Sequence, residues 1–491
     1  MSVIRKIYYG DRVKLKGKIS NPTGATGEIC VKRQDGKDLK PGKSEVNLTV
    51  SVDAKGDYNL ELLIENAWEW HRTPNKYDKL IATITYEGQK LKSSGLEVYP
   101  KPQIIVDFRR DSGYDGKYGF DWFREKRDGV NDYNDIFTGD INDLMDEYQQ
   151  NPLLWFNTKY DWHNKWGPTN NKERKYLQSY LTLYPKKSIK LSIIMDVFEV
   201  ALEDLELEYD KKLFTITPET LPIKGKGENQ EDKDFLLITC NNEFSKDKKI
   251  EVKSNKRLLG VLNIMANNKS THRFEKKILF INVTSDLTNS GVQETANPTG
   301  RETELKKYLA QALIKPENDT IETVELDVSI LDASTSDGSA NIEFNRLIND
   351  IQTSRETEAG NNAFFTQANN ILYANFDTPT EEKYRDHLKI YFIDEVRTSP
   401  GFDNLCGQAR ATPSNEVIVL RDGLNDSTLA HEAFHAMGLH HSFDNTGKNK
   451  FEEDKTDNIM DYSDVASVAI PVVSTWRWQW KDLQKGLPNE S

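Results

Sequence analysis

The chain has 491 residues, with 65 lysines and arginines against 78 aspartates and glutamates, and therefore a formal net charge of −13. This acidic balance argues against nucleic acid or an anionic membrane as the main partner, because both repel excess negative charge. No apolar run approaches the ~18 residues of a membrane-spanning helix, so no transmembrane segment is expected. At this length we expect three or four domains.

The N-terminal stretch from Met1 to Gly10 turns polar early and lacks the apolar core and small-residue cleavage site of a secretory signal. Either a signal peptide preceded this sequence, or the protein is leaderless. We expect a protein that is cytoplasmic before export and is secreted or injected by a route that needs no signal peptide.

Residues 1–100 show short segments of alternating polar and apolar residues between turn-forming residues. This period-two pattern predicts antiparallel strands, and an immunoglobulin-like β-sandwich is the expected fold of residues 1–100. The predicted strands lie at 13–19, 46–50, 58–62 and 81–86.

Residues 103–185 are rich in tryptophan, tyrosine, aspartate and asparagine, and 140–148 is predicted to be a helix. We interpret 103–185 as a small irregular domain whose aromatic residues, such as Trp155 and Trp166, form a core rather than a binding surface, because aromatic side chains contribute much of a core's burial energy. Alternation returns at 189–194 and 205–209.

Residues 186–272 are therefore predicted to form a second β-sandwich, with 224–233 as a solvated loop. From about residue 275 the pattern changes to α/β. The predicted elements are a buried strand at 278–283, a helix at 302–313, strands at 324–328, 388–393 and 417–420, and the start of a C-terminal helix at 474–480, with a polar insertion over 332–385. The fold class predicted is thus multidomain, with all-β sandwiches followed by an α/β domain over 275–491.

The segment 431–441 contains four of the eight histidines of the chain, in the spacing H-E-x-x-H-x-x-G-x-x-H. On a helix, His431 and His435 lie one turn apart on one face and can share a cation. Gly438 can end the helix in a left-handed turn, after which His441 can return to the same cation. His440 is interpreted as a bystander.

Three neutral imidazoles leave one tetrahedral position of a zinc ion open, as a catalytic zinc site requires. Zinc lowers the pKa of a bound water molecule from about 15.7 to roughly 7. Glu432 can then accept a proton from that water and pass it to a leaving amine. The alternative, that these histidines are ordinary helix-surface residues, does not account for all of the spacings together.

With this motif the sequence resembles the metzincin family of zinc metallopeptidases. That family has a second signature, a methionine-containing turn beneath the zinc, and the stretch from Asn458 to Ser463 supplies it with Met460 as the turn methionine. The resemblance is greatest to the pappalysin group, with matrixin-like enzymes second. Phe434 departs from the pattern, since many relatives have glycine there.

The resemblance covers 275–491 and implies a peptidase whose zinc ligands are His431, His435 and His441, with Glu432 as general base. For Tyr462 two roles stay open, a catalytic hydroxyl or a structural one. The family also implies that the fourth strand, 417–420, is an edge strand that pairs with an extended peptide substrate. Asp426 and Ser427 are predicted to cap the zinc helix.

The three cysteines, Cys30, Cys240 and Cys406, are far apart and predict no disulfide framework. Cys406 precedes the zinc motif and could approach the cleft as a latency ligand. We interpret it instead as a buried structural cysteine.

The main functional hypothesis is a zinc-dependent endopeptidase that hydrolyses protein or peptide substrates, exported and acting as a toxin or effector. The segments 119–122 and 181–187 resemble N-terminal regions of leaderless proteins exported by bacterial contractile injection (type VI-like) machines, which implies a secretion-machine component as a partner. The alternative is a non-catalytic secreted adhesion or delivery protein that keeps a structural zinc site.

Overall fold

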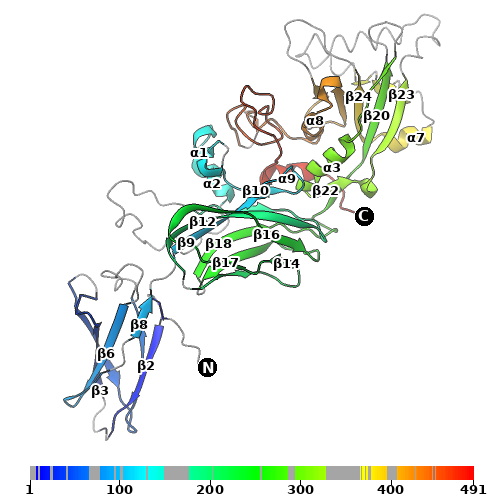
Figure 1. Ribbon diagram of the computed structural model, residues 1–491. Coiled ribbons are helices and arrows are strands. Elements are labelled where there is room, and N and C mark those ends of the chain that lie inside the picture. Colours follow the sequence, from blue (N-terminus) through cyan, green and yellow to red (C-terminus); the bar gives the residue numbers. More distant parts are fainter. Residues whose placement is uncertain are drawn as a thin grey trace, which may run out of the picture. The chain divides into compact units, whose positions relative to one another are not determined.

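The chain folds into two compact units in the computed structural model, and each unit is described separately below (Figure 1). The first unit comprises residues 1–105, 195–205 and 221–230, and the second comprises 106–194, 206–220 and 231–491. The structure describes residues 7–491 except for 9–11, 21, 23–25, 40–41, 66–77, 93–95, 100–102, 129–130, 149–175, 202, 255–256, 286–292, 328–364, 367, 371, 374–377, 395–405, 426, 445 and 448.

The first unit contains a six-stranded sheet in the order β1-β8-β6-β3-β4, with β7 on β6, and a two-stranded sheet of β2 and β5. The alternating residues of β3 bury Ile29 and Val31 in an apolar core that the strands enclose. All four strands predicted in this region are present, as β2, β4, β5 and β6. The bounds are Ile7–Tyr8 (β1), Arg12–Lys18 (β2), Thr26–Arg33 (β3), Glu45–Ser51 (β4), Asp57–Leu63 (β5), Asp78–Tyr86 (β6), Gln89–Lys92 (β7) and Leu96–Tyr99 (β8).

Two further sheets follow, one in the order β10-β11-β18-β17-β13-β15 and one in the order β14-β16-β12-β9. Alternation along these strands buries one face of each, as in the pattern of β14, where Phe214 and Ile216 are buried. The bounds are Gln103–Arg110 (β9), Phe120–Asp121 (β10), Ser179–Leu181 (β11), Ser188–Glu199 (β12), Leu205–Glu208 (β13), Phe214–Thr217 (β14), Thr220–Leu221 (β15), Gly227–Cys240 (β16), Lys248–Ser254 (β17) and Arg257–Ile264 (β18).

These sheets differ from the prediction at the boundary between 103–185 and 186–272. Strands β9, β10 and β11 come from the first range and share sheets with strands of the second. Residues 104–109 are buried almost throughout, so β9 needs a hydrogen-bonded neighbour inside a core. The predicted loop 224–233 is also wrong, because β16 starts at Gly227. The polar composition of 224–233 indicated a loop, but residues 227–233 form the first part of strand β16, beyond the apolar core.

The α/β region is built on a mixed sheet in the order β21-β20-β24-β26-β25, with β23 also paired to β20. The pairs of β20 with β23 and β24, and of β24 with β26, are parallel. Three of the predicted strands and the first helix are confirmed as β20, β23, β24 and α3. The bounds are Phe274–Lys276 (β19), Ile278–Ser285 (β20), Glu294–Thr295 (β21), Arg301–Gln311 (α3), Ile314–Pro316 (β22), Glu322–Asp327 (β23), Thr378–Tyr384 (α7), Leu388–Ile393 (β24), Gly407–Ala409 (β25), Glu416–Leu420 (β26), Thr428–Ala436 (α8) and Arg477–Gln484 (α9).

The predicted fourth strand is present as β26, but it is not the edge of the sheet. Strand β25 pairs with it in the antiparallel direction and, among the strands of the described residues, occupies that edge. With only the three residues Gly407–Ala409, β25 is too short for a period-two pattern to reveal. Most of the predicted insertion 332–385 lies outside the described residues, as do Trp155 and Trp166.

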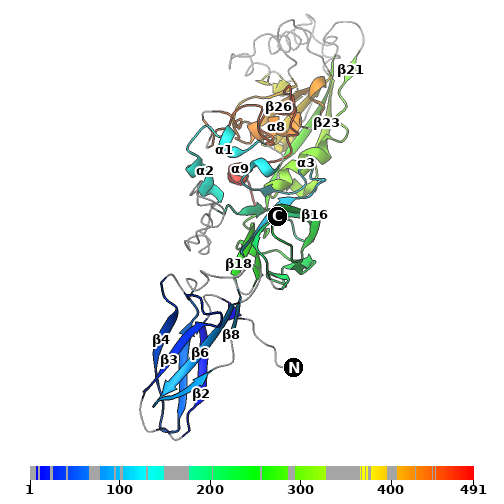
Figure 2. The same cartoon turned by 60° about the vertical axis from the view of Figure 1, so that its left-hand side comes forward.

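Both faces of this sheet are covered. Alternate residues such as Leu279 and Ile281 pack with Leu372 on one face, whereas Phe280 and Ile390 pack toward α3 and α8 on the other. The two helices lie against the same side of the sheet in Figure 2. This sandwiching explains why β24 is buried along its whole length and, apart from Lys389, consists of aliphatic and aromatic residues.

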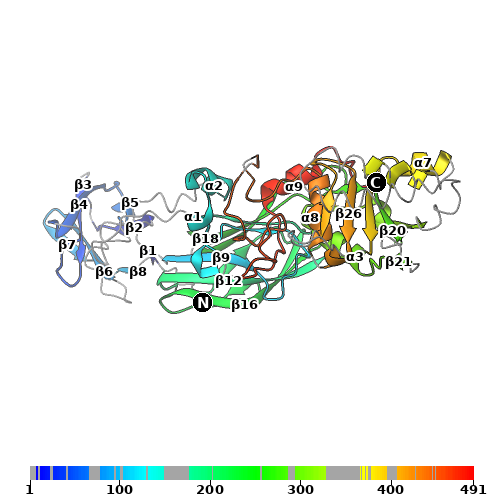
Figure 3. The same cartoon turned by 90° about the horizontal axis from the view of Figure 1, so that it is seen from above.

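The core beneath α8 also contains residues from far earlier in the chain. Helices α1 (Tyr133–Ile136) and α2 (Ile141–Tyr148) contribute Tyr133, Leu144 and Tyr148 to the same cluster as Phe434 and Trp476. Figure 3 shows these two helices on the same side of the second unit as α9. The helix predicted at 140–148 is therefore confirmed, and its apolar face packs into the α/β region. No helix in the described part of the chain is long and apolar enough to cross a membrane.

Candidate metal centre

Helix α8 carries the first two candidate ligands. Its N-cap residue is Ser427, as predicted, but the Ser427 hydroxyl donates a hydrogen bond to Asp464 at 2.5 Å instead of accepting one from the helix. The Asn425 side chain takes over that role and accepts the Thr428 amide at 2.8 Å. Asp426, the other predicted cap residue, lies outside the described residues.

The end of α8 turns the chain at Gly438, whose φ of +104° lies in a region that side-chain-bearing residues avoid. The Gly438 amide donates to the His435 carbonyl at 2.9 Å, and the Leu439 amide donates to the Phe434 carbonyl at 2.9 Å. The predicted helix-ending turn is therefore present, and it brings His441 back toward α8.

The three predicted histidines converge. The Nε2 atom of His435 lies 3.1 Å from that of His431 and 3.0 Å from that of His441. Nitrogen ligands placed about 2.0–2.1 Å from a tetrahedral zinc ion are about 3.3–3.4 Å apart, so the spacing here is close to that of a ligated set. The His431, His435 and His441 group can hold a metal ion.

Hydrogen bonds on the far side of two rings determine where their protons lie. The Nδ1 atom of His431 is 2.8 Å from the Ile459 carbonyl oxygen, and that of His435 is 2.7 Å from the Leu439 carbonyl oxygen. A carbonyl oxygen only accepts, so both Nδ1 atoms carry the proton and both Nε2 atoms of the neutral rings present lone pairs. Two lone pairs therefore face each other across 3.1 Å, an arrangement that a cation between them satisfies.

Burial keeps these rings neutral. It lowers the pKa of His431 well below its usual value, and it lowers the pKa of His435 to about 4, with the neighbouring His441 adding to the effect. The pKa of His441 is also lowered by burial. Neutral imidazole is the form that binds a metal ion.

Glu432 lies beside the ligands on α8 and contacts the edge strand. Its Oε2 atom accepts a hydrogen bond from the Ala409 amide at 2.8 Å. Burial raises the pKa of the Glu432 carboxyl to about 7, and the Ala409 amide opposes this shift only in part. A carboxyl with such a pKa can exchange a proton near neutral pH.

Met460 is fully buried beneath the site, in the core cluster that also contains Phe434. Its turn is held by side-chain and backbone bonds: the Met460 amide donates to Asn458 Oδ1 at 2.9 Å, and the Ser442 amide donates to the Met460 carbonyl at 2.9 Å. The turn thereby places the neighbouring Ile459 carbonyl against His431.

Tyr462 follows the turn and reaches the histidines. Its hydroxyl lies 2.8 Å from Nε2 of His441, and its ring stacks on that of His431 with centroids 5.4 Å apart. On its other side, His441 stacks on Phe443 with an interplanar angle of 7°. The Tyr462 hydroxyl thus lies at the ligand atoms, where either of the two predicted roles is open to it.

Two other predicted residues lie outside the ligand group. His440 is exposed and its Nδ1 atom is 3.6 Å from an Asp444 carboxylate oxygen, as expected for a bystander. Cys406 is partly buried and forms no disulfide with the other described cysteines, and the pKa of its thiol is raised, chiefly by burial. A raised pKa disfavours the thiolate that a metal ligand requires.

Sequence reasoning missed the backbone partners of the site. The Ile459 and Leu439 carbonyls orient the histidines, and the Ala409 amide orients Glu432. Almost any residue type can supply such a group. The positions of Gly438 and Met460 in the motif pointed toward the Leu439 and Ile459 carbonyls, whereas no signal in the sequence pointed toward the Ala409 amide.

Comparisons with known proteins leave the family unassigned. No protein family and no curated protein matches the sequence. Among solved structures, the fibronectin(III)-like modules of CbhA from Clostridium thermocellum match with 7% identity and a TM-score of 0.21, covering 53% of this chain and 88% of that chain. A protein of unknown function from Porphyromonas gingivalis matches with 9% identity and a TM-score of 0.16, covering 53% and 94%. TM-scores this low carry no argument about fold or function.

Proposed function

We propose that the protein is a zinc-dependent endopeptidase that hydrolyses protein or peptide substrates. The observation that carries this proposal is the pair of Nε2 lone pairs of His431 and His435 facing each other at 3.1 Å, with His441 completing the set. The donors fit zinc, since imidazole nitrogen is one of its preferred ligands and three such ligands leave one position for reaction.

Zinc, when bound here, supplies a Lewis acid that polarises a carbonyl group and makes water a better nucleophile. The residues of the chain supply the proton transfers. The Glu432 carboxylate accepts a proton from the attacking water and returns it to the leaving amine, and its raised pKa suits both transfers.

The edge strand β25 gives a physical reason for a polypeptide substrate. An unpaired strand edge can bind an extended peptide through main-chain hydrogen bonds. The Ala409 amide at this edge already bonds to Glu432, so a peptide lying along β25 would pass directly beside the proposed base.

Tyr462 supports the same chemistry through its hydroxyl, which can donate a hydrogen bond to negative charge that develops on the substrate oxygen. Its side chain is 38% exposed, so a substrate can reach it. We therefore assign Tyr462 the catalytic role of the two considered.

The alternative of a structural zinc site is disfavoured by the donor count. Structural zinc sites use four protein ligands, whereas the metal-binding group found among the described histidines, cysteines and acidic residues contains three.

The test of the proposal is the variant Glu432→Gln, which keeps the size of the side chain and removes the base. Because general base catalysis contributes roughly 10²–10⁴-fold, kcat/KM on a casein-type protein should fall by about that factor. Zinc content should stay at the wild-type level. Glu302→Gln, on the surface of α3, serves as the matched control and should keep full activity. Unchanged hydrolysis by Glu432→Gln would rule out the assigned role.

A further inference from the structure

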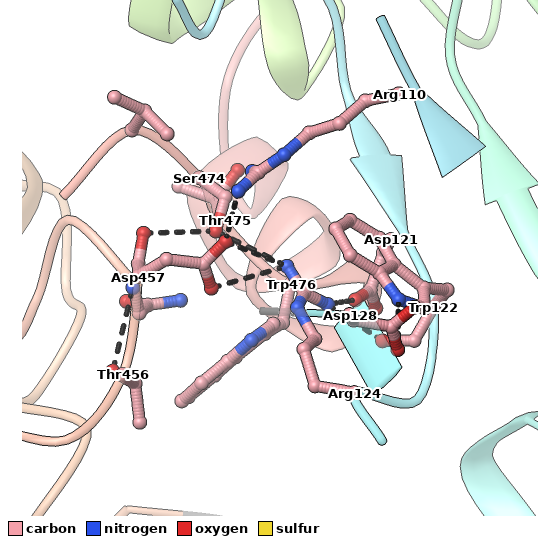
Figure 4. A network of polar contacts seen from close by, with 12 residues as sticks. Arg110, Asp121, Trp122, Arg124, Asp128, Thr456, Asp457, Ser474, Thr475 and Trp476 are labelled. Atoms are coloured by element: carbon pink, nitrogen blue, oxygen red, sulfur yellow. Dashed lines mark hydrogen bonds and ion pairs between the residues drawn. The ribbon is translucent and has the colours of Figure 1, made fainter. Parts of the chain in front are cut away.

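A network of buried arginines and aspartates includes Asp457, which directly precedes the methionine turn in the chain (Figure 4). The Asp457 carboxylate forms ion pairs with two arginines: Arg110 Nη2 lies 2.7 Å from Oδ2, and Arg124 Nη2 lies 3.3 Å from Oδ1. Arg124 also contacts Asp121 at 2.6 Å, and its side chain is fully buried. These charges are taken out of water only because each has an opposite charge beside it.

The two arginines come from residues that precede the predicted peptidase region. Arg110 ends β9, and Arg124 follows β10. Both also stack on Trp122, with the Arg110 and Arg124 guanidinium carbons 5.0 and 3.9 Å from its ring centroid. The arginines are therefore held in place independently of Asp457.

A short run of backbone bonds connects Asp457 to a metal ligand. The Asp457 carbonyl accepts from the Ser474 hydroxyl and amide, both at 3.0 Å. The Ser474 carbonyl accepts the Ile459 amide at 2.7 Å, and the Ile459 carbonyl in turn faces His431 Nδ1 at 2.8 Å. The orientation of His431 thus depends on a backbone segment that begins at Asp457, whose carboxylate is anchored by the two arginines.

From this geometry we infer that Asp457, clamped by Arg110 and Arg124, is a positioning residue for the metal centre. It fixes the 457–460 segment so that the Ile459 carbonyl holds the His431 ring with its Nε2 atom toward the metal. This inference rests on the proposed zinc site. It also assigns the early segment 110–124 a part in that site.

A matched control lies in the same network. The Asp128 side chain is as buried as that of Asp457 and is paired with Arg109 at 2.6 Å, but its other partners are the Trp122 indole and the Glu125 amide. Replacing either aspartate removes one buried negative charge, from beside Arg109 in the case of Asp128 and from beside Arg110 and Arg124 in the case of Asp457. Only the replacement of Asp457 disturbs the segment that contacts His431.

The experiment measures the zinc affinity of the full chain, by competition with a chromophoric chelator, for the wild type, Asp457→Asn and Asp128→Asn. Outer groups that orient a ligand contribute about 10–100-fold to metal affinity. We expect Asp457→Asn to weaken zinc binding by that amount, and Asp128→Asn to keep wild-type affinity even if it lowers thermal stability. Equal affinities in all three proteins, or equal losses in both variants, would overturn the inference.

Arg110 provides a second variant in case Asp457→Asn does not fold, because its side chain is 18% exposed and Arg124 remains on Asp457. Arg110→Met should weaken zinc binding by about tenfold, and Arg110→Lys should restore much of it. Wild-type affinity in Arg110→Met would count against the clamp. A wild-type protein that binds no zinc would remove the proposed function together with this inference, whereas normal binding by the wild type and every variant removes the inference alone.

Discussion

At the scale of single residues, the site combines side chains that the sequence reveals with backbone groups that it does not. The spacing of His431, His435 and His441 predicted a shared cation because helical periodicity and a glycine turn are local properties. The carbonyl of Ile459 and the amide of Ala409 lie on other segments, and their roles depend on how the chain returns to α8. Such backbone partners are determined by the tertiary structure, and they cannot be recognised from the residue types in the sequence.

The raised pKa of Glu432 predicts a pH-dependent stability difference in the metal-free protein. The carboxyl titrates at about 7 in the folded chain against 4.5 ordinarily, so its ionisation opposes folding. The stability of the wild type relative to Glu432→Gln is therefore greatest below pH ~4.5 and falls as the pH rises through about 7, by on the order of 3 kcal/mol in total.

Urea unfolding in the presence of a chelator, at several pH values between these limits, measures this difference. Glu302→Gln on the surface of α3 is the control and should run parallel to the wild type. A gap between wild type and Glu432→Gln that does not change with pH would contradict the assigned burial.

At the scale of elements, helix α8 and its end are predictable, whereas the sheet edge beside it is not. Helix α8 ends where Gly438 requires it to end. In contrast, β25 has only three residues, and its position depends on its pairing with β26 across a turn. No periodic pattern in the sequence predicts such a short strand. The sequence therefore predicted β26 as the edge strand, whereas its neighbour β25 lies at the edge of the described sheet.

Gly438→Ala tests the turn at the end of α8. The site offers space, since the nearest atom to an added Cβ would be Pro413 Cβ at 3.9 Å, so the cost arises from the φ of +104° alone. We expect a loss of stability of about 1–2 kcal/mol and a zinc affinity reduced by about tenfold, because His441 moves with the turn.

Gly300→Ala is the matched control, with a φ of +86° and nothing within 4 Å of an added Cβ. It precedes α3 and should show a comparable loss of stability with unchanged zinc affinity. If the two variants bind zinc equally well, the turn does not position His441.

At the scale of the whole molecule, the unit that carries the metal centre begins much earlier than the motifs indicate. The resemblance covered 275–491, but Tyr133 and Tyr148 pack in one core with Trp476, and Arg124 contacts Asp457. Of the aromatic residues of 103–185 that the structure describes, Tyr133 and Tyr148 are buried, as the composition predicted, whereas Trp155 and Trp166 lie outside the described residues. The composition of 103–185 does not indicate which distant segment packs against these residues, because long-range packing produces no periodic pattern in the sequence.

A truncation to residues 275–491 tests this shared core. It removes Phe123, Tyr133, Leu144 and Tyr148, and each large core side chain contributes about 3–5 kcal/mol. The sum of about 12–20 kcal/mol matches or exceeds the total stability of about 5–15 kcal/mol of an ordinary domain, so 275–491 should show no cooperative thermal unfolding. Residues 103–491 should unfold cooperatively and bind zinc. Cooperative unfolding of 275–491 with full zinc affinity would show that the early segments are dispensable.

Anomalous diffraction at the zinc edge, from crystals of the full chain, decides whether three histidines form an open zinc site. We expect a single peak about 2.0–2.1 Å from Nε2 of His431, His435 and His441, with no fourth protein ligand. No peak between the three rings, or a fourth side chain that closes the coordination sphere, would contradict the proposed open site.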